Sequence, residues 1–213
     1  LVVTNLNDNL TNYALQEGLP DAQVSAMAVD PSGVLWMGSG GVLVRVEGRT
    51  LVPLALPSSN DGARIMGLVA DSMGRVFIGT DGGGMFVSDG QGIKPLSGYP
   101  ADTAAQVRAV LLLRDGGLLI GLRNGLVHWK DGASKRVDLG EATPVIISAL
   151  AQARNGDWWV GTFGNGVYRI GKDGTRTEYD EESGLLQNNV RCLLVDDRDR
   201  LWVGTKLGLN VFD

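Results

Sequence analysis

The sequence has few of the residues with which proteins build reactive or metal-binding centres. Its 213 residues include one cysteine, Cys192, and one histidine, His128. A single cysteine excludes an internal disulfide, and one cysteine with one histidine assembles neither a zinc cluster nor a nucleophile–histidine relay. Cys192 lies in the apolar run Val190–Val195, which predicts a buried and inert thiol. We therefore predict no metal and no cofactor.

Long apolar runs and basic runs are also missing. No segment approaches the ~18 consecutive apolar residues of a membrane helix, so no membrane span is expected in this chain. The net charge is −5 and no cluster of lysines and arginines is present. Because nucleic-acid binding needs a basic stripe to displace counterions, we predict no nucleic-acid partner.

Helical periodicity is absent as well, and a strand-and-turn repeat stands in its place. Glycines number 31 and recur in pairs that would break helices. The motif Leu-Trp-Val-Gly-Thr at 201–205 has four relatives, at 35–39, 76–80, 118–122 and 158–162. Their glycines, at 38, 79, 121, 161 and 204, are separated by 41, 42, 40 and 43 residues. A steady period in this range indicates an array of supersecondary units.

Each unit has the same order of features. An apolar run is followed by a turn with aspartate and glycine, then the Trp-x-Gly strand, a second glycine turn, a third strand and a more polar fourth segment. In the fifth unit Asp199 takes the glycine position of the first turn, and aspartate tolerates the left-handed conformation. Four-stranded antiparallel units that become more polar outward are typical of propeller blades. We predict an all-β, five-bladed β-propeller, with residues 1–213 as one domain.

The ends of the sequence indicate how the ring would close. The fifth unit stops after its third strand, whereas Thr11-Asn12-Tyr13 followed by Gly18-Leu19 matches Thr177-Glu178-Tyr179 followed by Gly184-Leu185. We therefore expect residues 11–16 to complete the last blade and remove the open edges. In the same alignment residues 1–4 match a third strand, so the alternative is a fragment of a larger propeller, for example a seven-bladed one.

At its clearest the unit resembles the two-component-regulator propeller repeat. The matching residues are Gly184-Leu185, Val190, Asp196, Leu201-Trp202-Val203-Gly204-Thr205 and Gly208-Leu209. The third unit departs most, with Leu113 for the acidic residue, Leu119 for the aromatic one and Leu122 for threonine. The resemblance implies a sensor-type propeller of a bacterial signalling protein, periplasmic or extracellular, ahead of a membrane span and an output domain. It also implies a ligand that is often a carbohydrate.

Candidate ligand-binding residues lie where the loops between second and third strands and the loops joining blades should share one rim. They are Asp81, Arg108, Arg123, Asn124, Phe163, Asn165, Arg191 and Lys206. Polar groups with an aromatic at a concave mouth are typical of small-molecule sites, although ordinary loop tips have the same composition. The aromatics at the repeated position (Trp36, Phe77, Trp159, Trp202) are expected to pack between blades. Trp129 and Trp158 fall outside that position and are better ligand candidates.

Three functions fit this sequence. We predict a non-catalytic sensor module that binds a small molecule such as a carbohydrate at the rim and acts on an output domain or partner protein. The second is a protein-interaction scaffold without a small ligand, which a flat rim with an apolar patch would favour. The third is a hydrolase or lyase, which two carboxylates about 5–10 Å apart would favour.

Overall fold

The computed structural model describes residues 12–57, 63–89, 91–100 and 106–213. A 3-10 turn, η1 (Leu15–Glu17), precedes strands that form five antiparallel sheets. The strands are β1 (Val24–Val29), β2 (Leu35–Ser39), β3 (Val42–Glu47) and β4 (Thr50–Ala55); β5 (Arg64–Ala70), β6 (Val76–Asp81), β7 (Gly84–Ser88) and β8 (Ile93–Pro95); β9 (Val107–Leu112), β10 (Leu118–Leu122), β11 (Gly125–Lys130) and β12 (Ala133–Val137); β13 (Ile147–Gln152), β14 (Trp158–Thr162), β15 (Val167–Ile170) and β16 (Arg176–Tyr179); and β17 (Val190–Val195), β18 (Leu201–Thr205) and β19 (Gly208–Phe212). We call the sheets blades one to five.

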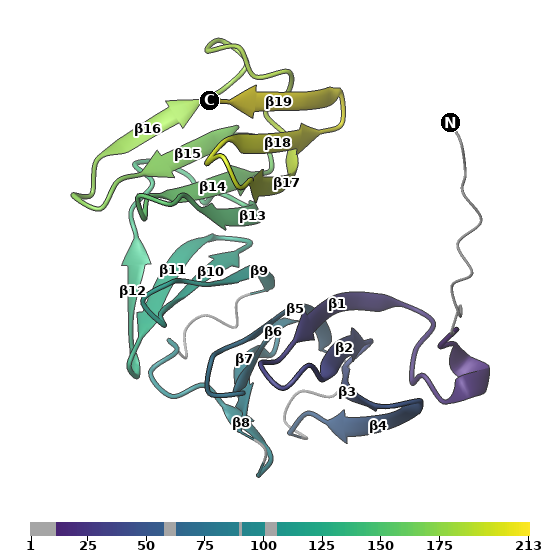
Figure 1. The fold of residues 1–213 in the computed structure, drawn as a ribbon. Coiled ribbons are helices and arrows are strands. Elements are labelled where there is room, and N and C mark those ends of the chain that lie inside the picture. The colour runs from purple at the N-terminus through teal and green to yellow at the C-terminus, as the bar shows by residue number, and fades with distance from the viewer. Residues whose placement is uncertain (1–11, 58–62, 90, 101–105) are drawn as a thin grey trace, which may run out of the picture.

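The five blades follow one another around an arc (Figure 1). Their first strands lie innermost and contact one another in the order β1, β5, β9, β13 and β17. The all-β, propeller-like architecture and the five repeats predicted from the sequence are confirmed. Blades one and five lie at the two ends of the arc, apart from each other (Figure 1). No helix in the described ranges is both long and apolar enough to cross a membrane.

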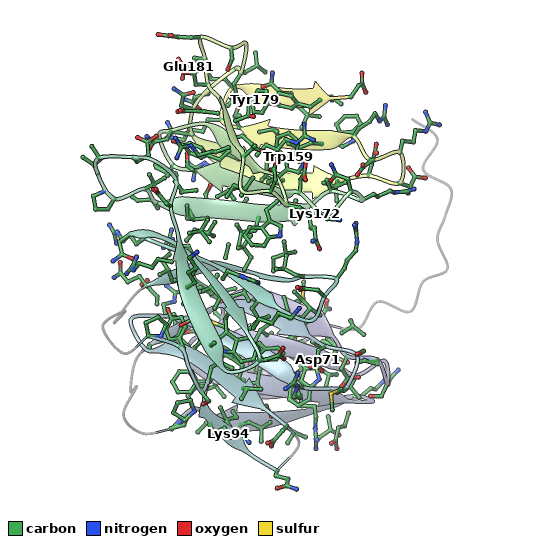
Figure 2. All side chains as sticks on the ribbon, turned by 90° about the vertical axis from the view of Figure 1, so that its left-hand side faces the viewer. Asp71, Lys94, Trp159, Lys172, Tyr179 and Glu181 are labelled. Atoms are coloured by element: carbon green, nitrogen blue, oxygen red, sulfur yellow. The ribbon has the colours of Figure 1, made fainter. Side chains whose placement is uncertain are left out.

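The hydrophobic core lies between blades. At the repeated aromatic position the rings of Trp36, Phe77 and Trp159 are 6%, 0% and 8% exposed, so the packing role expected of them is confirmed. Trp159 packs against Tyr179 of its own blade and Phe212 of the next, with ring centroids 5.8 and 6.0 Å away. Figure 2 shows Trp159 among the sheets, whereas Lys94 lies at the periphery. Burial of one large ring per junction holds neighbouring blades together.

The inner strands share a β-bulge, and one turn residue of blade five has a left-handed backbone conformation. Every inner strand carries a β-bulge near its start, at Ser25, Met66, Arg108, Ser148 or Arg191. A bulge leaves one residue unpaired and redirects its side chain. In the turn between first and second strands of blade five, Asp199 has φ 64°, the left-handed conformation expected for a residue in the glycine position.

The predicted closing strand is not observed. Among the described residues the last sheet contains only β17, β18 and β19, and residues 12–17 contain η1 and no strand; Thr11 lies outside the described residues. The segment belongs to blade one instead. Leu19 is buried with Met37 and Val44, and the Tyr13 hydroxyl donates a hydrogen bond to the Gly48 carbonyl over 3.3 Å. Leu19 and Tyr13 thus contact blade one. Closure of a five-bladed ring by residues 11–16 stays a prediction, as does the alternative of a fragment of a larger propeller.

The expectation of a buried thiol is wrong. Cys192 is exposed, although it lies on the innermost strand of its blade. Its counterpart in blade one, Ala26, packs against the core cluster that blade two shares. The apolar run correctly indicated the inner strand β17. The side of this strand that carries Cys192 is buried only where another blade packs against it.

Candidate ligand-binding groove between blades three and four

A cavity lies between blades three and four. It has a volume of about 800 Å³. It opens at what we call the Asp-turn edge, formed by the turns between first and second strands and between third and fourth strands. The lining residues are Leu113, Arg114, Asp115, His128, Lys135, Arg136, Val137, Asp138, Gln152, Arg154, Gly156, Trp158, Ile170, Gly171, Lys172 and Gly174. None of the eight predicted rim residues is among them.

The groove occurs where two blades lack the aspartate of the first turn. In blades one, two and five this aspartate (Asp30, Asp71, Asp196) accepts hydrogen bonds from turn amides and from an indole or guanidinium of the second strand. The equivalent residues of blades three and four are Leu113 and Ala153. Neither can hold the turn against its own second strand in this way. The two turns are connected to each other instead.

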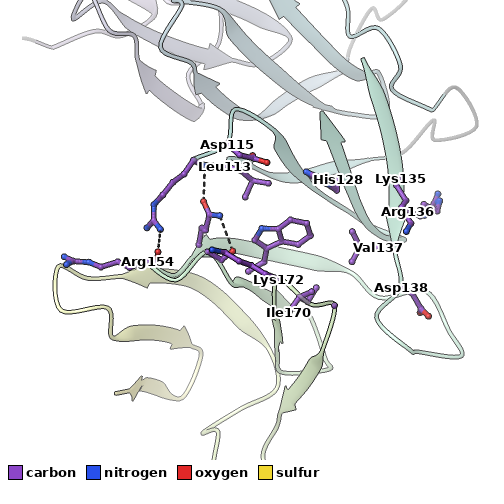
Figure 3. A pocket seen from close by; sticks show the side chains of 16 residues that line it. Leu113, Asp115, His128, Lys135, Arg136, Val137, Asp138, Arg154, Ile170 and Lys172 are labelled. Atoms are coloured by element: carbon purple, nitrogen blue, oxygen red, sulfur yellow. Dashed lines mark hydrogen bonds between the residues drawn. The ribbon is translucent and has the colours of Figure 1, made fainter. Parts of the chain in front are cut away.

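Arg114 makes that connection. Its backbone N–H donates to Gln152 Oε1 over 3.0 Å, and its guanidinium donates to the carbonyls of Ala153 and Arg154 over 2.7 and 2.9 Å. These bonds run from the turn of blade three to the turn of blade four at one end of the groove (Figure 3). A fixed link at one end keeps the two walls at a set separation.

An aromatic pair forms the inner part of the groove. The rings of His128, from β11, and Trp158, from β14, are 5.0 Å apart and tilted by 51°. His128 Nε2 is buried and has no hydrogen-bond partner among the described residues. Burial lowers the pKa of His128, against the opposing effect of the Asp115 carboxylate. The imidazole is therefore neutral at neutral pH, and with the half-exposed indole it offers an apolar surface with polar edges.

The groove carries an excess of positive charge. Lys135 lies on β12 opposite His128, and Lys172 lies in the turn after β15, so the two come from different blades (Figure 3). Within the described ranges neither lysine, nor Arg114, forms an ion pair with a carboxylate. Asp115 is already paired with Lys130 over 2.7 Å. In a protein of net charge −5, three cations without acidic partners favour an anionic group at this place.

The predicted rim residues lie at the opposite edge, which we call the bulge edge. Arg108 and Arg191 are bulge residues of β9 and β17 and are exposed. The Arg191 guanidinium lies 4.9 Å from the centre of the Phe163 ring. Arg123 donates to Gln106 Oε1 over 2.9 Å. The structure thus brings Phe163 and Arg191 together, and separates both from the groove.

The other predicted residues of the bulge edge are less connected. Asp81, at the end of β6, has a buried Oδ1 with no hydrogen-bond partner in the described part of the chain. Asn165 donates its backbone N–H to Thr162 Oγ1, and Lys206 is exposed in the turn between β18 and β19. Asn124 borders a second, smaller cavity of about 370 Å³. A ligand site at this edge stays a prediction.

Of the two tryptophans singled out by sequence, one lies in the groove. Trp158 lines it, whereas Trp129 is 6% exposed and donates its indole N–H to the Ser97 carbonyl over 2.8 Å. The lysines and His128 were not predicted as ligand residues. The departure of Leu113 from the repeat was the available signal, because it removes the aspartate at one wall. Among the described residues no three histidine, cysteine or acidic side chains are placed to hold a metal ion.

Repeated four-stranded blades around an arc, with a groove between two of them, define a propeller-type repeat array. Residues 18–41 and 184–206 match the two component regulator propeller family. The resemblance noted from the sequence is therefore confirmed for these two segments. The two matches fall in repeats one and five.

Comparison with known proteins adds relatives of greater length. The chain is 30% identical over 156 residues to histidine kinase P4 of Formosa agariphila, which covers 64% of this chain and 11% of that protein. The extracellular domain of the hybrid two component system BT3049 from B. thetaiotaomicron superimposes with a TM-score of 0.76 at 23% identity, covering 92% of this chain and 27% of that one. Virginiamycin B lyase from Staphylococcus aureus gives a TM-score of 0.72 at 16% identity, covering 89% and 69%. At these identities the two structures show a shared fold.

Proposed function

We propose that this chain is a non-catalytic sensor module of a bacterial signalling protein, placed in the periplasm or outside the cell, and that the groove between blades three and four is its ligand site. The observation that carries the ligand site is the groove itself, with an aromatic pair and three cations that form no ion pair with any described carboxylate. The signalling context is supported by the family of the repeats and by the similarity to a histidine kinase. The placement outside the cytoplasm is supported by the extracellular domains with the same fold.

The groove suits a small carbohydrate that carries a carboxylate. A sugar ring can lie against the apolar face of Trp158, which is half-exposed, while Lys135 and Lys172 reach a negative group from the two walls. Ammonium groups serve as point charges for an anion, and they are worth more in a partly enclosed groove than on an open surface. The signal would pass to an output domain or partner protein that responds to the relative position of the two blades.

Thermal unfolding with galacturonate, galactose and buffer alone tests this proposal. A ligand present at one hundred times its Kd stabilises the folded protein by about 2.7 kcal/mol. We therefore expect galacturonate to raise the midpoint of thermal unfolding, and galactose to raise it less. The variant Lys172→Gln should weaken the response to galacturonate while leaving that to galactose, and Trp158→Leu should weaken both. The matched control at the opposite edge is Arg191→Gln, which should leave both responses intact.

Other outcomes assign other functions. A response lost in Arg191→Gln and kept in Lys172→Gln would place the ligand at the bulge edge and overturn the groove. No response to a wider panel of sugars and organic acids would favour the interaction scaffold. Because a lyase shares this fold, catalysis is a second candidate function. If the protein converted any compound of the panel, the sensor proposal would be wrong.

A further inference from the structure

Three departures from the repeat meet at one point in the wall of the groove. Gly117 precedes the second strand of blade three at a position that is valine, arginine or aspartate in the other blades. His128 of β11 stands where the other third strands have arginine or valine, opposite the repeated aromatic position. Trp158 begins β14, whereas the other second strands begin with leucine or valine. The repeat itself therefore requires none of these three side chains.

The three residues fit one another. A Cβ added at Gly117 would lie 3.0 Å from His128 Nε2, although the backbone of Gly117 does not have the positive φ that favours glycine. The glycine therefore provides room for the edge of the imidazole. The other neighbour of the imidazole is the Trp158 ring of the next blade, with centroids 5.0 Å apart. Together they place the only histidine of the chain in the wall of the groove.

Charges of both signs surround the imidazole, and cations predominate. The nearby charged groups come from four elements: Asp115 from the turn between β9 and β10, Lys130 from β11, Lys135 from β12 and Lys172 from the turn after β15 (Figure 3). The other charged residues that line the groove are Arg114, Arg136, Asp138 and Arg154. The hydrogen bond from Lys130 holds the pKa of Asp115 below its usual value, so this carboxylate stays ionised in the range of histidine titration.

The unliganded protein accommodates a protonated imidazole poorly. His128 Nε2 is buried and has no hydrogen-bond partner in the described part of the chain, so a proton there would form a buried N–H without an acceptor. Burial, together with the charge of Lys130, lowers the pKa of His128, and Asp115 offsets this in part. The groove therefore presents a neutral ring until the pH falls below the usual range of histidine.

A carboxylate bound in the groove reverses this balance. An opposite charge within about 4–6 Å favours the charged form and moves a pKa by about 1 to 3. Lysine and arginine are already charged near neutral pH, so histidine is the side chain whose charge can respond there. We infer that the groove binds its anionic ligand together with a proton taken up from solvent by His128, so that an acidic sugar binds more tightly at acidic than at neutral pH. This inference rests on the ligand site proposed above.

The direction and size of the effect follow from linkage. Because the ligand prefers the protonated ring, the affinity rises as pH falls through the pKa of His128 in the complex, and it levels off below the pKa in the free protein. Galacturonate itself stays ionised above pH 5, since carboxyl groups of this kind titrate near ~3.5. A pKa raised by one corresponds to a tenfold gain in affinity, so the Kd for galacturonate should be about tenfold lower at pH 5 than at pH 8.

The single histidine makes the measurement direct. In the protein without added histidines, the C2 proton of His128 gives one imidazole NMR signal of this kind. The signal is followed from pH 8 to pH 5 for the protein alone, with saturating galacturonate and with galactose. Galacturonate should raise the midpoint of this titration by about one pH unit or more, whereas neutral galactose should leave it in place. Calorimetric titrations of galacturonate at pH 8 and pH 5, in two buffers of different ionisation enthalpy, give the Kd values and the number of protons taken up.

Two variants separate the proton from other effects. His128→Gln keeps a polar side chain that does not titrate, so the ratio of the Kd values at pH 8 and pH 5 should fall from about ten to about one. A merely structural role of His128 would weaken binding equally at both pH values and would leave this ratio unchanged. The matched control is Arg191→Gln at the bulge edge, which should keep the ratio of the unaltered protein.

Each other outcome overturns the inference. Equal affinities at the two pH values, with an unmoved His128 signal, would do so while the proposed ligand site stands. A pH dependence that persists in His128→Gln would assign the proton to another group. An equal rise of the His128 midpoint with galactose would show that the charge of the ligand is not the cause. Absence of galacturonate binding at both pH values would overturn the ligand site and this inference together.

Discussion

The internal junctions and the two ends of the array are built from the same residues in different surroundings. We call the second-strand glycine of each blade a socket, and the β-branched residue of the next inner strand that packs against it a plug. At Gly121 the socket is filled by Ile147, which is 0% exposed. Near Gly204 no side chain of another blade is described, and Val24, at the plug position of blade one, is 40% exposed. The side chains are equally apolar in both places. Burial is therefore a property of the junction and not of the residue, as expected when repeats contact only their neighbours.

The end blades also differ in how their turns are held. In blades one and five the turn aspartate accepts a hydrogen bond from the indole of the repeated tryptophan, over 2.9 Å in both Asp30–Trp36 and Asp196–Trp202. Blades three and four have no such aspartate, and Arg114 links their turns across the junction. The turns of blades one, two and five are held by bonds within the blade, and those of blades three and four by contacts between the two blades. The predictions below test this difference.

The largest effect is expected from filling a socket. Gly121→Val places three carbons where even one would lie 2.5 Å from Ile147, so it should cost about 3 kcal/mol or more, at the upper end of measured overpacking effects. A Cβ on Gly204 would lie 2.5 Å from the Cys192 thiol, but that side chain is exposed and can turn into solvent. Gly204→Val should therefore change the free energy of unfolding by less than about 0.5 kcal/mol, as for ordinary surface substitutions. Urea denaturation of both variants measures the contrast. Equal losses would mean that the socket at Gly204 is filled.

Removing a plug should have the next largest effect. Ile147→Ala leaves a cavity at the junction of blades three and four and should cost about 2–3 kcal/mol, within the range for buried isoleucine. Val24→Ala removes side-chain carbons that are already partly in water, and its expected cost is below about 0.5 kcal/mol. Denaturation midpoints at an unchanged m-value would check both numbers. A costly Val24→Ala would show that blade one is covered in solution.

Local patterns in the sequence predict most of the fold. Period, turn glycines and apolar runs are repeated within about 40 residues, so they indicate strand order, the buried aromatics and the positive φ of Asp199. The exposure of Cys192 and the position of residues 12–16 could not be predicted in the same way. Both depend on which neighbour covers blade five, and no pattern within a repeat encodes that neighbour.

The groove was only partly predictable, for a related reason. Sequence reasoning sought ligands where loops differ at the bulge edge, and it noted Trp158 as an exception to the repeat. The cavity arises from two absences, Leu113 and Ala153 in place of aspartate, in adjacent repeats. An absence in one repeat is a weak signal, and its effect appears only when the neighbouring repeat has lost the same residue. Comparison of adjacent repeats would have pointed to this junction.

Weaker effects are expected from the turn aspartates. Asp196→Asn removes the charge on the acceptor of the Trp202 indole and of the Arg200 guanidinium, which lies over the Trp202 ring. Solvent screening weakens these charge-assisted hydrogen bonds, so we expect a loss of stability smaller than that of Ile147→Ala. Hydrogen exchange of the β17–β18 amides should accelerate, while that of β9–β10 should not. Uniform acceleration would contradict a role confined to the end blade.

The smallest expected effect is a pH dependence of blade one. The hydrogen bond from the Ser32 hydroxyl, with further bonds from the Trp36 indole and turn amides, holds the pKa of Asp30 at about 2 instead of 3.8. A carboxyl whose pKa is lower in the folded protein adds stability that is complete above the unfolded value and is lost as pH falls through the folded one. Protection of the β1–β2 amides should therefore decline between pH 4 and pH 2, by less than any substitution above. Asp30→Asn should remove that decline, because the asparagine amide has no proton to gain in this range, and a decline that persists in the variant would assign it to other carboxyls.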